Sequence, residues 1–208
     1  MLFNLSSRFA LSGGVGYITG KYSAMRTGKN QEGLTTARSG INQKAKAVPV
    51  TLGIYYYLPV SSKSRVYINA GAGYYFARFS SSSYRENDTP YKMDTDTTGS
   101  GGDVCFHGGS GFEYHLAENV AIVIEGFGRY AKISGFKGTR NQSDSNNWSD
   151  SLDATHYHYA QYAWTEEWLP RTGFGTEPPS GENIRNVRDY ETDFTGYTLK
   201  LGLKIKLL

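Results

Sequence analysis

The segment GYTLKLGLKIKL, residues 196–207, sets the interpretation of the whole chain. Tyr, Leu and Ile occupy every second position, and Gly, Thr and Lys stand between them. Side chains of a β-strand alternate between two faces, so a period of two indicates a strand with one apolar face. The other face is small or charged, which predicts that the two faces meet different surroundings.

Five further segments alternate in the same way, at residues 9–25, 47–58, 65–80, 102–116 and 119–135. Their apolar faces carry Val, Ile, Leu, Phe and Tyr, whereas the other faces carry mostly Gly, Ser, Ala and Tyr. A strand face that meets water is expected to be dense in charged residues, and these faces are not. The pattern predicts an all-β, antiparallel up-and-down transmembrane β-barrel with lipid around its apolar face.

The expected connections alternate in length. Short links at 4–8, 59–64 and 117–119 separate long polar segments at about 26–46, 81–101 and 136–193. Short turns on one side and long loops on the other are typical of outer-membrane barrels, with the turns in the periplasm. We therefore expect one barrel domain over residues 1–208, with the three long segments as extracellular loops.

Only six strands are visible, whereas closed bacterial barrels contain at least eight. An open sheet would expose two unpaired edges to lipid, where backbone groups find no hydrogen-bonding partner. We therefore expect a barrel of eight strands whose N-terminal hairpin is missing from this sequence. The first residues also show neither the basic nor the apolar region of a signal peptide.

Composition excludes several other classes. The mean hydropathy is −0.50 and no apolar run approaches the roughly 20 residues of a membrane-spanning helix. A formal charge of +3 predicts no nucleic-acid partner. Cys105 is the single cysteine, so no intramolecular disulfide can form, and its mid-strand position predicts a buried thiol.

Charged residues on the polar faces form the first candidate site. Buried charges must be paired, so we expect a salt-bridge network in the barrel lumen. Its expected members are Asp103, Glu113, Glu125, Arg129, Lys200 and Lys204. A second interpretation of the same residues is a narrow, gated ion path in which these pairs rearrange.

Catalytic and metal sites are not expected, nor is any cofactor. His107 points inward and Ser110 outward by alternation, so they cannot share a hydrolase site with a nearby acid. Asp153, His156 and His158 fall in the last long segment, where solvated loop residues are the expected state. No further ligands accompany the His-x-His pair, so the sequence predicts no metal site.

The last long segment holds the second candidate site. Exposed aromatic side chains suit contact with a protein or a glycan, so these residues are candidate contacts for a surface ligand of unknown identity. The candidates are Trp148, Tyr157, Tyr159, Trp164 and Trp168. This segment is acidic and residues 26–46 are basic, so the two are expected either to fold together or to leave the basic segment for lipopolysaccharide phosphates.

The stretches FALSGGVGY (9–17), VYINAGAGY (66–74) and GFEYHLAENVA (111–121) carry a family resemblance. In these stretches the chain resembles the small outer-membrane β-barrel proteins of Gram-negative bacteria, the OmpA/OmpW-like superfamily. The resemblance covers the strand regions and none of the long segments. It implies a barrel in the outer membrane, with lipid and lipopolysaccharide as partners. Such chains usually end on an aromatic residue, whereas this one ends on Leu207-Leu208.

The expected function follows from these patterns. We expect a monomeric, non-enzymatic barrel that gives structural support or binds a surface ligand through its long segments. One alternative is a narrow channel for small solutes of the OmpW kind, against which the charged lumen argues. Another is a soluble lipocalin-like barrel, which would need the Gly, Ala, Ser and Tyr faces to meet water.

Overall fold

The computed structural model describes residues 1–29, 35–87, 91–162 and 168–205. These residues form strands, turns and bends, and the strand pairs are antiparallel. The prediction of an all-β, antiparallel fold is therefore confirmed. Among the described residues, no helix is long and apolar enough to cross a membrane.

Fourteen strands follow one another in the part of the chain that the structure describes. They are β1 (Leu2–Asn4), β2 (Phe9–Val15), β3 (Ile18–Lys29), β4 (Thr35–Pro59), β5 (Ser64–Asn87), β6 (Lys92–Ala117), β7 (Val120–Tyr130), β8 (Lys132–Ile133), β9 (Lys137–Asp144), β10 (Ser149–Tyr162), β11 (Trp168–Gly175), β12 (Ile184–Asp189), β13 (Thr192–Asp193) and β14 (Gly196–Ile205). Most residues of the six alternating segments lie in β2 and β3, β4, β5, β6, β7 and β14.

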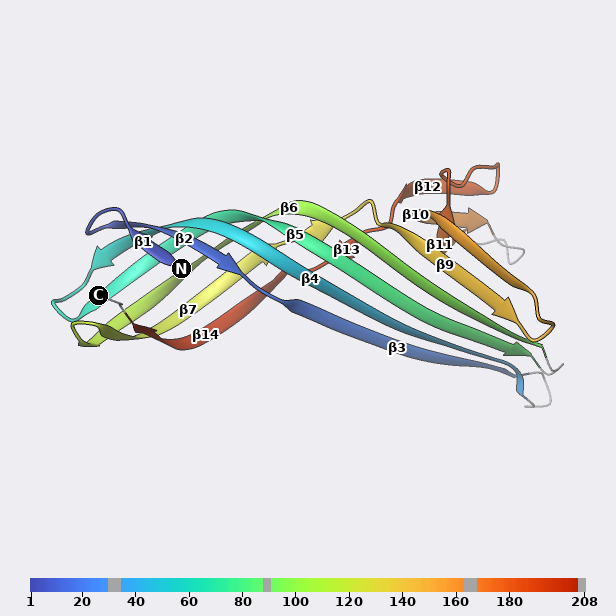
Figure 1. Ribbon diagram of the computed structural model, residues 1–208, viewed down its shortest axis with the longest axis horizontal. Coiled ribbons are helices and arrows are strands. Elements are labelled where there is room, and N and C mark those ends of the chain that lie inside the picture. Colours follow the sequence, from blue (N-terminus) through green and yellow to red (C-terminus); the bar gives the residue numbers. More distant parts are fainter. Residues whose placement is uncertain (30–34, 88–90, 163–167, 206–208) are drawn as a thin grey trace.

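Three long strands, β4, β5 and β6, run through the whole length of the molecule (Figure 1). They contain 25, 24 and 26 residues, which at about 3.3 Å per residue makes each roughly 80 Å long. The register between β4 and β5 is unbroken from Pro59↔Arg65 to Ala37↔Asn87. The prediction of long loops at 26–46 and 81–101 was wrong, because most of these residues extend the hairpins.

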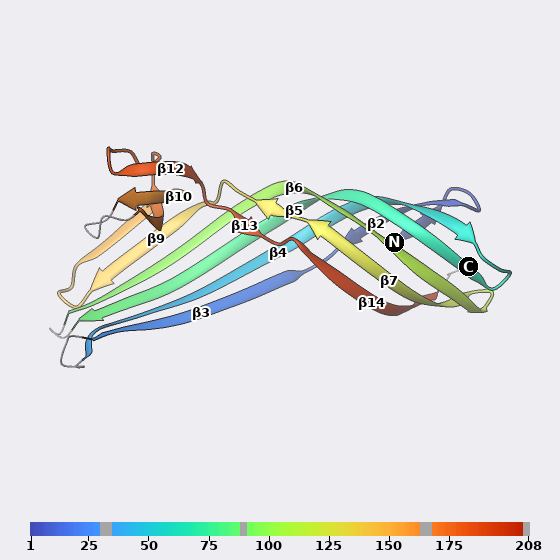
Figure 2. The ribbon, with the colours of Figure 1, turned by 180° about the vertical axis from the view of Figure 1, so that it is seen from behind.

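The strand that pairs with β6 changes from β7 to β9 along its length. Near the end that holds both chain termini, the order is β1-β2-β4-β5-β6-β7-β14, and we call this the proximal half (Figures 1 and 2). Toward the other end the order is β3-β4-β5-β6-β9-β10, the distal half. Within the described residues β14 pairs with β7 alone, and β1 lies at the opposite edge, so this sheet is open.

Pro49 explains why the first predicted strand is divided into β2 and β3. It lies in the middle of β4, whereas the alternating segment 47–58 had placed it near the start of a strand. Its carbonyl accepts a hydrogen bond from the Gly16 amide at 3.0 Å. In a regular antiparallel pair the N–H of residue 49 would donate back to the Gly16 carbonyl, but proline has no N–H. The pairing is thereby interrupted at Gly16 and Tyr17 and resumes at Ile18↔Ala47 without a change of register.

The two faces of the proximal half differ as the alternation predicts. On its inner face, defined here as the face of Tyr57 and Tyr67, these two side chains are each 2% exposed. Its outer face, defined as the face of Leu52 and Leu201, leaves these two side chains 73% and 77% exposed. Cys105 is buried on the inner face, as expected.

The chain after β7 packs onto the inner face instead of forming one long loop. Ala131, Ile133, Phe136 and Phe194 pack with Tyr75 and its buried neighbours on β4, β5 and β6. β8 pairs with β13 across this segment, through Ile133↔Thr192 and Lys132↔Asp193. The prediction of a loop over 136–193 was therefore wrong, since β9 to β13 lie within it. We call residues 131–136 and 192–194 the inner segment.

Candidate functional site: the inner charge network and the distal hairpins

Glu113 on β6 is the most buried charged residue of the inner face, at 2% exposure. Arg65 lies directly opposite it on β5, and the Arg65 Nε donates to Glu113 Oε2 at 2.6 Å. Lys204 on β14 donates to the other carboxylate oxygen at 2.7 Å. A buried carboxylate held by two cations is compensated, whereas removal of the carboxylate would leave the two cations without a counter-charge.

Tyr57 joins the two cations of this cluster. The Arg65 guanidinium lies 4.1 Å from the centre of the Tyr57 ring, and Lys204 Nζ donates to the Tyr57 hydroxyl at 3.2 Å. The ring also packs on Tyr55 and Tyr67. The Tyr side chains therefore fill the space around the ion pairs and fix their positions.

Glu125 on β7 forms a second cluster beside the first. Lys200 lies directly opposite on β14 with its Nζ 3.5 Å from the carboxylate, and the Asn69 side-chain amide donates to Glu125 at 2.6 Å. The Tyr55 hydroxyl adds a hydrogen bond at 3.3 Å. Lys200 also lies 4.1 Å from the Phe127 ring centre, which shields its ammonium group on one side.

Four of the six predicted network residues come together in these clusters: Glu113, Glu125, Lys200 and Lys204. Arg129 instead donates through Nε to the Phe194 carbonyl at 2.6 Å and ties β7 to the inner segment. Asp103 accepts a hydrogen bond from the amide of Val104, its own neighbour. Within the described residues neither of these two forms an ion pair with the clusters.

The sequence missed four members of the network. Arg65 alternates inward but stands at a strand start, which made it look too shallow to reach Glu113. Asn69, Tyr55 and Tyr57 carry no charge, so a search for paired charges passed over them. Their inward position was visible in the alternation, while their contacts with two carboxylates depend on the register between strands.

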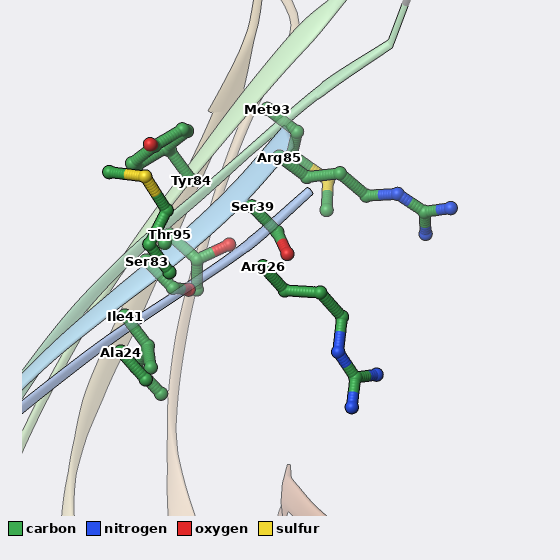
Figure 3. A pocket seen from close by; sticks show the side chains of 11 residues that line it. Ala24, Arg26, Ser39, Ile41, Ser83, Tyr84, Arg85, Met93 and Thr95 are labelled. Atoms are coloured by element: carbon green, nitrogen blue, oxygen red, sulfur yellow. The ribbon is translucent and has the colours of Figure 1, made fainter. Parts of the chain in front are cut away.

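The distal halves of β3, β4 and β5 form a cationic hollow on the inner side of the sheet. Arg26, Ser39 and Arg85 lie side by side in one row across these strands. Figure 3 shows both guanidinium groups extending to the same side, with the Ser39 hydroxyl between their stems. The hollow has a volume of about 590 Å³. Within the described residues, no ion pair joins the basic residues 26–46 to residues 136–193.

The predicted aromatic candidates lie in different places. Trp148 is half exposed in the turn between β9 and β10, whereas Tyr157 is buried at 7% exposure on β10. Tyr159 and Trp168 line one hollow formed by β10, β11 and β12. Trp164 lies outside the described residues.

The two histidines of β10 correct a further expectation. His156 is not a solvated loop residue but is 8% exposed, stacked on Tyr190 with ring centres 4.2 Å apart and planes at 8°. It also contacts Phe79 of β5. Burial lowers the pKa of His156 to about 4, and the neighbouring His158 acts in the same direction. In the described part of the chain no group of three or more metal-ligating side chains occurs.

Comparisons with known proteins complete the description of the site. Protein-family models, curated proteins and solved structures yield no match to this chain.

Proposed function

We propose that this chain is a non-enzymatic outer-membrane β-barrel protein that gives structural support or binds a surface ligand through its distal hairpins. One observation carries the proposal. The proximal half exposes Leu, Ile, Val and Phe over its outer face, while its inner face buries paired charges. A water-soluble protein rarely leaves such a wide apolar surface uncovered. In a membrane barrel, lipid covers a surface of this kind.

The extent of the apolar surface agrees with this proposal. On β4 it runs from Val48 to Leu58, and on β5 from Val66 to Phe76. A tilted strand needs about 9–11 residues to cross a membrane. The remaining residues of β4, β5 and β6 would then stand outside the bilayer, and they would carry the hairpins of β9 to β12 on the cell surface.

Closure of the sheet is part of the proposal, as is the assignment to the OmpA/OmpW-like superfamily. Open edges at β14 and at β1 would leave backbone N–H and C=O groups unpaired in lipid, at a cost of several kcal/mol each. Eight is the smallest strand number of the known closed barrels in this class. The described proximal half has seven strands, and we propose that one further strand joins β14 to the β1 edge in the membrane, which brings the number to eight.

The packing of the inner face favours a supporting role over the alternative of a narrow channel. Tyr55, Tyr57 and Tyr67 pack around the ion pairs, and Phe194 of the inner segment packs in the separate cluster around Tyr75. Solute passage would require these pairs and rings to move together. We therefore expect no single-channel conductance in planar bilayers. Stable conductance steps would contradict the supporting role and favour the narrow channel.

Fractionation with a heat-shift assay tests the proposal. The full-length gene product, expressed in a Gram-negative host, is expected in the outer-membrane fraction. Unboiled and boiled samples should run at different positions on a denaturing gel, because a folded barrel resists detergent at room temperature. Recovery in the soluble fraction with no mobility shift would contradict the proposal and favour a soluble binding barrel.

A further inference from the structure

A second hollow lies among the distal strands β10, β11 and β12, and its lining is unusually cationic. It has a volume of about 490 Å³, within the range of small-ligand sites. We call it the arginine pocket and define it by its principal lining residues: His158, Tyr159, Trp168, Arg171, Arg185 and Arg188. Ala160 and Asn186 complete the lining.

The backbone of β12 brings two arginines to one face. His158 pairs with Arg188 and Ala160 pairs with Arg185, so one residue of β10 stands opposite two residues of β12. In a regular strand, residues three apart point to opposite faces, but this bulge places Arg185 and Arg188 on the same face. Asn186, within the bulge, has a φ of 56°, a left-handed conformation that asparagine tolerates well.

The position of Arg185 is fixed by aromatic contact. Its guanidinium carbon lies 3.8 Å from the centre of the Trp168 ring, and Trp168 in turn packs on Tyr162 at 5.3 Å. A stacked guanidinium keeps its N–H groups at the edge of the plane, where they can bind a planar or tetrahedral oxyanion through two hydrogen bonds. The stack therefore holds this side chain ready for an anion.

The pocket has no counter-charge of its own among the described residues. No acidic side chain is part of its lining, and none of the described ion pairs includes its three arginines. The nearby Glu191 is paired with Lys132 at 3.2 Å. Arg185 and Arg188 lie on one face, where their guanidinium groups repel each other, and a bound anion relieves that repulsion.

His158 contributes a proton-dependent group to the same hollow. Burial lowers its pKa, and the positive charge of Arg188 lowers it further, while Glu191 and a hydrogen bond to the Arg171 backbone act in the opposite direction. The ring stacks on Tyr190 at 4.8 Å and is held in place. An anion bound beside it would offset the effect of Arg188 and raise its pKa.

We propose that the arginine pocket binds a phosphate monoester carried on a sugar, with Arg185 and Arg188 holding the phosphate and the aromatic side chain of Trp168 contacting the ring. This inference deepens the proposed surface-binding role and rests on it only for the source of the ligand. That source is either a phosphorylated surface glycan, such as that of lipopolysaccharide, or a free sugar phosphate. Binding itself can be measured on the folded protein without a membrane assay.

Titration calorimetry on the detergent-solubilised full chain tests the inference, with glucose 1-phosphate as probe and glucose as its neutral counterpart. We expect saturable binding of glucose 1-phosphate and none of glucose. Arg185→Gln and Arg188→Gln should each weaken binding at least about tenfold, since a hydrogen bond to a charged group contributes that much. Arg8→Gln, which removes the same charge from an exposed turn of the proximal half, should leave binding unchanged.

Competition experiments distinguish a surface glycan from a free sugar phosphate as the ligand of the arginine pocket. Competition by lipopolysaccharide but not by its dephosphorylated form would support the inference with a surface glycan as source. Lack of competition alongside glucose 1-phosphate binding would support it with a free solute. Wild-type affinity in both pocket variants, or no saturable binding by a chain that shows the heat shift, would overturn it. The His158 ring resonances should also titrate at higher pH with glucose 1-phosphate present, and an unchanged titration would count against the pocket.

Discussion

Glu113 on β6 and Lys204 on β14 form an ion pair at 2.7 Å although β7 lies between their strands. Lys204 stands opposite Ala121 of β7, and Glu113 stands opposite Val123 of the same strand. The ammonium group therefore reaches diagonally over β7, where the small side chain of Ala121 leaves room for the lysine stem. This contact links three strands through one buried carboxylate.

Removal of that carboxylate is expected to destabilise the fold. Glu113→Gln leaves Arg65 and Lys204 without their charged partner in a buried site, which costs about 3–5 kcal/mol. Urea unfolding in detergent micelles, followed by gel mobility, measures the loss. Glu118→Gln in the exposed turn before β7 is the matched control and should unfold like the wild type. Equal midpoints for the two variants would show that the network contributes nothing to stability.

A charge on the outer face separates lipid from water as the surrounding medium. Ile54→Arg lies in the middle of the apolar surface of β4 and should cost about 2–4 kcal/mol if that surface faces lipid. In water the same exposed substitution would change stability by only about 0.5 kcal/mol. Folding into vesicles, titrated with urea, measures the difference. Val60→Arg, in the exposed turn after β4, is expected to fold nearly as well as the wild type.

Acid is expected to loosen the distal strands. The pKa of His156 is about 4 in the folded protein and about 6.5 when unfolded, so the unfolded state binds the extra proton between these values. Its contribution of about 3 kcal/mol is fully present above pH 6.5 and is lost as the pH falls to 4. Tryptophan fluorescence in urea at pH 7 and pH 4.5 follows this region. His156→Phe should reduce the difference in stability between pH 7 and pH 4.5. An unchanged difference in stability would show that another group causes it.

Arg129 is expected to hold the inner segment in place. Arg129→Met removes the charged donor from the Phe194 carbonyl, a bond that contributes about 1.5–3 kcal/mol. Amide exchange at Phe194, whose N–H donates to the Ala131 carbonyl, should then become faster. Arg78→Met, on the exposed outer face of β5, provides the control. Equal exchange rates at Phe194 in both variants would mean that the inner segment does not depend on Arg129.

The proximal half was predictable from the sequence because one face of each strand is apolar. That contrast located six of the seven described strands, all but β1, together with their short turns and the inward direction of Glu113 and Glu125. The distal half was not predictable, since Ser80 to Ser83 and Thr95 to Thr98 are polar on both faces and show no period. Its pairing comes from backbone hydrogen bonds that continue the register of the hairpins.

The contacts of individual site residues depended on register, which alternation does not specify. Arg129 and Lys200 both alternate inward, yet one meets a backbone carbonyl and the other meets Glu125. Arg185 and Arg188 stand three residues apart, so strand alternation alone predicts that their side chains point to opposite faces. Only the bulge opposite Tyr159 places them together in the arginine pocket.

Depth-dependent quenching tests most directly whether the outer face of the proximal half meets lipid. Single-cysteine variants at Leu52 and at Ser82, in a Cys105→Ala background, carry a fluorophore on exposed outer positions of the proximal and distal halves. In vesicles, the label at Leu52 should be quenched by nitroxide lipids and protected from aqueous iodide, and the label at Ser82 should behave in the opposite way. Quenching of Leu52 by iodide as strong as that of Ser82 would contradict the membrane assignment.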